Sequence, residues 1–231
     1  MGMFLAISGI IGKPQAAVAE SLGRYAQSVG GGLQQQLLSN NHKNFSVIEQ
    51  DNNNTSIFYP DDFLNWDEAS AFLSQDLNTP VFSFHIHDSD LWMYILYYKG
   101  EIIDQFNPVP GYWSDDITDE EKAAWKGNAA IIEQYVPGVQ KESIEKYLVS
   151  WETDTEPVQA YAGDTFVQED WQLLDFMKKL QLPYPLDDDG NARATGNVYA
   201  LWTEDILLEP QKDAATATLS GTSSKPWWKF W

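Results

Sequence analysis

Cysteine is absent from this sequence of 231 residues. Without thiols the chain cannot form disulfide bonds, thiolate metal sites or a cysteine nucleophile, so these sources of stability and chemistry are excluded. Small secreted domains often depend on disulfides, whereas proteins of reducing compartments do not. The composition therefore fits a cytoplasmic protein, and we expect one of bacterial type.

Positive charge is scarce, because 14 Lys and Arg residues stand against 34 Asp and Glu, for a net charge of −20. DNA, RNA and anionic membranes attract proteins mainly through Lys and Arg. The sequence therefore argues against nucleic acid and membrane surfaces as partners. It permits a basic protein as partner, since opposite fields would speed encounter. The alternative is that the acidity only keeps the protein soluble.

Long apolar runs are also missing, and none approaches the roughly 20 residues that a membrane-spanning helix needs. Residues 3–11 (MFLAISGII) are apolar, but no Lys or Arg precedes them as in a secretory signal. We interpret this run as a strand and expect no membrane span.

Aromatic residues are abundant, at 14% of the chain with ten Trp, which predicts a packed core rather than a disordered chain. They are densest between Pro80 and Trp113. Three runs in this stretch, residues 81–86, 91–98 and 101–106, predict antiparallel strands joined by short turns. The middle run has no charge, so we expect it to be buried on both faces.

The residues before this stretch predict two helices and three more strands. Strands are expected at residues 4–11, 45–49 and 56–59, and apolar spacing predicts helices at 14–29 and 65–77. The Gln- and Asn-rich residues 33–44 are expected to form a loop. The order strand, helix, two strands, helix, three strands predicts an α+β fold with a mainly antiparallel sheet and helices on one side.

Beyond Trp113 the pattern becomes helical. Helices are predicted from Thr118 to near residue 135, at 141–151 and at 168–180, with a last strand at 198–202. This divides the chain into a sheet domain (1–113), a helical part packed on it (114–209) and a tail (210–231). The first two parts can also share one core. Residues 211–224 have the composition of a mobile linker.

His85 and His87 are candidate metal ligands. At positions i and i+2 of a strand they share one face, and Asp88 or Asp90 can add an oxygen ligand. A divalent transition metal held there would activate water. The pattern superficially resembles the HxH of amidohydrolases and the HxHxDH of metallo-β-lactamase-type hydrolases, but both need more than the three histidines of this chain. The alternative is two ordinary histidines on a partly solvated sheet face.

Other catalytic patterns fail. Residues 9–14 lack the first glycine and the Ser or Thr of a phosphate-binding loop. The acidic run at 187–191 lacks the ligand spacing of an EF-hand, and no GxSxG motif occurs. No catalytic residue is assigned.

The last seven residues, K-P-W-W-K-F-W, are unusual after a polar stretch. Four aromatic side chains are costly to leave in water, so they dock on the domain, bind a partner or enter a membrane interface, which the acidity of the chain disfavours. We therefore expect a non-enzymatic interaction module, without a cofactor, that sequesters a basic partner as immunity proteins and antitoxins do. The alternative is a metal-dependent hydrolase using the histidine cluster. The predicted partner-binding residues of the tail are Trp227, Trp228, Phe230 and Trp231.

Overall fold

The computed structural model describes residues 2–36, 45–114, 116–151, 159–160, 163–164, 167–188, 191–193 and 195–204. Eight strands form one sheet, and every neighbouring pair is antiparallel. With five α-helices this is the α+β class that the sequence predicts. The strands are β1 (Leu5–Ile10), β2 (Gly32–Gln36), β3 (Ser46–Asp51), β4 (Asn54–Phe58), β5 (Val81–His87), β6 (Leu91–Tyr98), β7 (Glu101–Phe106) and β8 (Asn197–Trp202).

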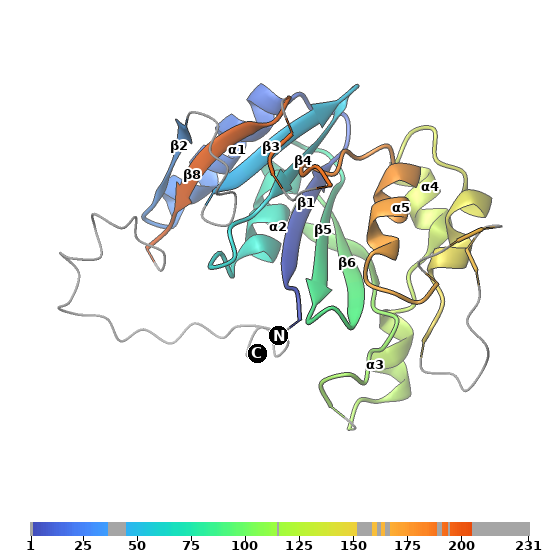
Figure 1. Ribbon diagram of the computed structural model, residues 1–231. Coiled ribbons are helices and arrows are strands. Elements are labelled where there is room, and N and C mark those ends of the chain that lie inside the picture. Colours follow the sequence, from blue (N-terminus) through green and yellow to red (C-terminus); the bar gives the residue numbers. More distant parts are fainter. Residues whose placement is uncertain are drawn as a thin grey trace.

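Two helices cover one face of the sheet. In Figure 1, α1 (Gln15–Ser28) and α2 (Trp66–Asp76) lie behind the strands. Their apolar residues pack with those of the sheet in one cluster, which includes Ile10 of β1, Leu22 of α1 and Leu73 of α2. The sequence predicts both helices and their placement on one side, because apolar residues recur at helical spacing in each.

The opposite face is covered by later parts of the chain. The second apolar cluster joins Phe84 of β5 and Tyr94 of β6 to Ile132 and Phe176. Ile132 belongs to α4 (Ala129–Tyr135) and Phe176 to α5 (Gln172–Lys179), which lie on the right of Figure 1. The middle of the sheet is thus buried between two layers, and this explains why β6 carries no charge.

The order of the strands is β2-β8-β3-β4-β1-β5-β6-β7. The orange-red β8 lies between the blue strands β2 and β3 in Figure 1, although it comes from the end of the described chain. One strand of the second half is therefore part of the sheet. The larger apolar cluster likewise contains residues from both sides of residue 113.

The prediction of a loop over the Gln-rich residues is wrong where β2 forms. Residues Gly32 to Gln36 pair with Trp202 to Val198 of β8. Backbone groups bond in this way whatever the side chains are, so a polar segment becomes an edge strand when a partner strand is beside it. Residues 37–44 lie outside the described chain.

Helices occupy only part of the region after Trp113. The predicted helix after Thr118 is two shorter ones, α3 (Asp119–Ala124) and α4, because Gly127 adopts a positive φ of 68° between them. Thr118 and Glu121 form a capping box at the start of α3, whereas Asn65 makes no side-chain hydrogen bond at the start of α2. Residues 141–151 contain only two 3-10 turns, Lys141–Ser143 and Glu145–Tyr147.

The predicted long helices fail there for a tertiary reason. Ile144 and Tyr147 point into the core from the short turns, and the backbone N–H of Trp151 donates to the carbonyl of Pro108. Docking on the sheet thus replaces helical hydrogen bonds with longer-range ones. Among the described residues, no helix has the length and apolar character that crossing a bilayer requires.

Candidate functional site

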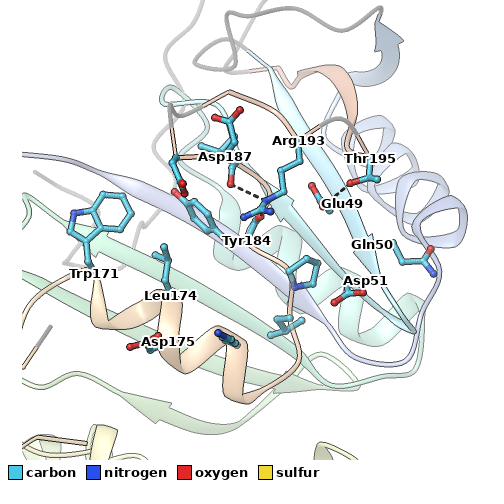
Figure 2. A pocket seen from close by; sticks show the side chains of 15 residues that line it. Glu49, Gln50, Asp51, Trp171, Leu174, Asp175, Tyr184, Asp187, Arg193 and Thr195 are labelled. Atoms are coloured by element: carbon cyan, nitrogen blue, oxygen red, sulfur yellow. Dashed lines mark hydrogen bonds between the residues drawn. The ribbon is translucent and has the colours of Figure 1, made fainter. Parts of the chain in front are cut away.

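A cavity of about 1000 Å³ lies between the end of β3, α5 and the connection from α5 to β8. Acids outnumber bases in its wall, with five carboxylates against two cations, and the wall also includes two aromatic rings. Figure 2 shows residues of β3 on one side and residues at the start of α5 on the other. The charged and aromatic wall residues are Glu49, Asp51, Asp175, Asp187, Asp188, Lys178, Arg193, Trp171 and Tyr184.

Arg193 holds the connection between α5 and β8 in place at the cavity wall. Nε of Arg193 donates hydrogen bonds to the carbonyl oxygens of Tyr184 (2.9 Å) and Leu186 (3.0 Å). These bonds keep the guanidinium at the cavity wall, where Figure 2 shows it between Tyr184 and Glu49. Arg193 therefore partly balances the carboxylates around it.

Glu49 is the buried acid of this site. Its side chain is only 6% exposed, and Oε1 accepts a hydrogen bond of 2.9 Å from the hydroxyl of Thr195. Within the described chain, the buried Oε2 has no hydrogen-bond partner. Burial raises the pKa of Glu49, although the Thr195 hydroxyl and Arg193 oppose this, while Asp51 adds to the rise. A donor brought to Glu49 would therefore be favourable.

We expect Glu49→Gln to raise the free energy of unfolding at pH 7 by on the order of 1 kcal/mol. Glutamine keeps an acceptor for Thr195 but removes the buried charge. Because the pKa of Glu49 is raised in the folded state, its ionisation costs stability, and this loss develops as the pH rises above the ordinary Glu value. Urea unfolding should separate the variant from the wild type at pH 7 and not at pH 4. Equal stability at both pH values would contradict this account.

The aromatic end of the cavity is made by Trp171 and Tyr184. Their ring centroids are 6.5 Å apart and the rings are nearly perpendicular, at 82°. Burial raises the pKa of Tyr184 to about 12, so its hydroxyl stays protonated and can donate. Two perpendicular rings beside carboxylates form a wall that suits a cation with apolar parts.

The start of α5 explains why Trp171 is available. Helical spacing predicts that Trp171, Leu174, Met177 and Leu180 are buried. Met177 and Leu180 are buried as predicted, but the helix begins at Gln172, and Leu173 and Phe176 join them in the core. Trp171 and Leu174 are only partly buried and line the cavity. The prediction is wrong for Trp171 and Leu174, because the packing of α5 on the sheet decides which side of the helix is covered.

His85 and His87 share one face of β5, as their spacing requires. The ring of His85 stacks on Trp66 at 4.9 Å and 10°. His87 is held edge-on by Phe4 and Trp113, with ring centroids 4.9 and 5.0 Å away. Both histidines are buried, so this face is not solvated. Nε2 of His85 lies 3.4 Å from Nδ1 of His87.

The two carboxylates near the histidines, Asp88 and Asp90, each accept a hydrogen bond from another segment of the chain. Asp88 accepts a hydrogen bond of 2.8 Å from the backbone N–H of Gly2, and Asp90 accepts one from the hydroxyl of Tyr112. Burial lowers the pKa of His87, although Asp88 and Asp90 oppose this. In the part of the chain that the structure describes, no three His, Asp or Glu side chains are grouped so that they could hold a metal ion.

The remaining predicted residues, Trp227, Trp228, Phe230 and Trp231, lie outside the described residues. Sequence reasoning missed the cavity. Its one local signal is Glu49, an acid that directly follows the apolar Val47 and Ile48. Comparison with protein-family models, with curated proteins and with solved structures found no match for this chain. Any functional proposal therefore depends on the chemistry of the cavity and of the histidine pair.

Proposed function

We propose that the protein is a non-enzymatic binding module for a basic protein, and that the cavity receives cationic side chains of that partner. Sequestration of the partner, as by an immunity protein or antitoxin, is its concrete form. The observation that carries this proposal is the cavity wall, where five carboxylates face two cations. An excess of acidic groups on a concave wall focuses the field on an approaching cation.

Two features favour binding over catalysis. Among the described residues of the cavity wall, the Thr195 hydroxyl donates to the buried Glu49 and Arg193 donates to carbonyl oxygens, so these groups hold the wall together. The net charge of −20 supplies long-range attraction for a basic partner. Trp171 and Tyr184 then offer rings to an arginine or lysine side chain.

The test is binding of a fluorescein-labelled octa-arginine peptide, followed by fluorescence anisotropy in 50 and 500 mM NaCl. We expect saturable binding that weakens at least tenfold at the higher salt, because screening shortens the range of the field. Absence of saturable binding at 50 mM, or affinity that does not change with salt, would contradict the proposal.

A second candidate function is a metal-dependent hydrolase centred on His85 and His87. The separation of 3.4 Å between their facing nitrogens favours it. Two nitrogen ligands on one tetrahedral zinc, with bonds of about 2.0–2.1 Å, lie at about that separation. A third ligand is needed, and Asp88 or Asp90 would have to exchange a present hydrogen bond for the metal. Bound metal would supply an activated water.

Elemental analysis of the purified protein tests this second candidate. Stoichiometric zinc, iron or manganese that is lost in the His85→Ala/His87→Ala variant would support it. A wild-type protein that takes up none of these ions when they are supplied would overturn it, and the 3.4 Å contact would then be a hydrogen bond between two imidazoles.

A further inference from the structure

We propose that residues 225–231 of the same chain (K-P-W-W-K-F-W) are an internal ligand of the acidic cavity and compete with the basic partner for it. This inference rests on the proposed function, because it assigns to the same site a cationic and aromatic occupant. It also accounts for a motif that a soluble binding module would otherwise expose to water.

The chemistry of the segment complements that of the cavity. The segment has two lysines, four aromatic residues and no acid, in a chain where acids outnumber bases by 34 to 14. The cavity has an excess of three carboxylates over cations and carries the rings of Trp171 and Tyr184. Ammonium groups and aromatic faces thus meet their usual partners there.

A buried acceptor provides an independent reason to place a cation at this site. Glu49 is 6% exposed, and its Oε2 has no hydrogen-bond donor among the residues that the structure describes. The turn that holds Thr195 and Gly196 lies against this carboxyl group, since the Thr195 hydroxyl donates to Oε1 and Gly196 lies beside Oε2. The ammonium of Lys225 or Lys229 can therefore pair with Glu49 after a small movement of this turn, or with the exposed Asp51 and Asp188 without one.

Geometry allows the segment to reach the cavity. Thr195, just before β8, is part of the cavity wall, and the chain leaves the sheet at the other end of β8, where Glu204 donates its N–H to Val29. The eight residues from 196 to 203 separate these ends by about 25 Å at 3.3 Å per residue. A polar linker of about 20 residues has a root-mean-square length of about 25 Å.

This match of span and length gives the segment a local concentration of about 1 mM. A segment that binds with a Kd of about 0.1 mM would then occupy the cavity roughly ten times as often as it leaves it vacant. The affinity of the cavity for a competing ligand would fall about tenfold. Even a weak internal ligand thus raises the concentration of partner that is needed to fill the cavity.

The experiment compares the full-length chain with a full-length variant in which Trp227, Trp228, Phe230 and Trp231 are all replaced by alanine. The variant keeps the net charge and the two lysines, so a general charge effect cancels. We expect it to bind the octa-arginine probe about tenfold more tightly. The free peptide K-P-W-W-K-F-W should bind the variant with a Kd near 0.1 mM and displace the probe.

Two controls test whether the peptide binds in the cavity and through its aromatic residues. A peptide with its four aromatic residues replaced by alanine should bind at least fivefold more weakly. In the tail variant, Asp51→Asn/Asp188→Asn should weaken peptide binding, whereas Asp61→Asn/Asp62→Asn, on the loop before α2, should not. Peptide binding that is indifferent to the cavity substitutions would overturn the inference.

The inference and the proposed function can fail separately. If both chains bind the probe with the same salt-sensitive affinity and the peptide does not bind the variant, the inference is wrong and the proposed function stands. If neither chain binds the probe, the proposed function is wrong. The peptide titration then still decides whether the segment occupies the cavity.

Discussion

Replacement of Phe176 by alanine is expected to lower the free energy of unfolding by about 3–5 kcal/mol. Phe176 is fully buried and joins α5 to the sheet. Its ring lies 5.0 to 6.4 Å, between centroids, from four other buried rings, so a cavity in this cluster cannot close by a small shift. The four rings are those of Phe84, Trp92, Tyr94 and Tyr147.

Urea unfolding followed by tryptophan fluorescence and far-UV circular dichroism measures this loss. Leu174→Ala is the matched control, because Leu174 lies on the same helix but is only partly buried at the cavity wall. We expect it to cost about 1 kcal/mol or less. A loss below about 1.5 kcal/mol for Phe176→Ala would mean that α5 adds little to the packing of the sheet.

In the tail variant, where Trp227, Trp228, Phe230 and Trp231 are alanine and no longer compete for the cavity, Asp51→Asn/Asp188→Asn is expected to weaken binding of the octa-arginine probe about five- to tenfold at 50 mM NaCl. Both carboxylates are exposed at the cavity wall, and pairs of this kind contribute about 0.2–1 kcal/mol each. Removing two of them changes the net charge only from −20 to −18. The large effect would therefore come from their position.

Asp61→Asn/Asp62→Asn makes the same change in net charge at another exposed place. Residues 61 and 62 follow β4 at its end away from the β3–β4 hairpin, and hence away from the cavity wall at Asp51. This control should change the affinity less than twofold. Equal effects of the two double substitutions would show that the probe senses the total charge and that the cavity is not its site.

Local patterns account for the parts of the fold that the sequence predicts well. The predicted strands 91–98 and 101–106 are those of β6 and β7, because each is a run of strand formers bounded by turn residues. The helices α1 and α2 begin and end within two residues of their predicted bounds, because residues that disfavour helix, such as glycine and proline, flank them. Each of these signals lies within one segment.

The candidate sites show the opposite case. Spacing alone places His85 and His87 on one face, but only the packing of α2 decides that His85 stacks on Trp66. The cavity joins Glu49 of β3 to Trp171 at the start of α5, more than a hundred residues later. The residue pattern within either segment does not indicate that the two segments lie close together, so the site was not predictable from its own residues.

The sequence by itself determined the α+β class, the antiparallel meander of β5 to β7 and the acidic charge, because composition and short-range periodicity encode them. Only the tertiary structure decided that β8 lies between β2 and β3, that residues 141–147 form 3-10 turns, and that Glu49 is buried beside a cavity. These features depend on backbone pairing and burial between distant segments, whose energies local propensity does not contain.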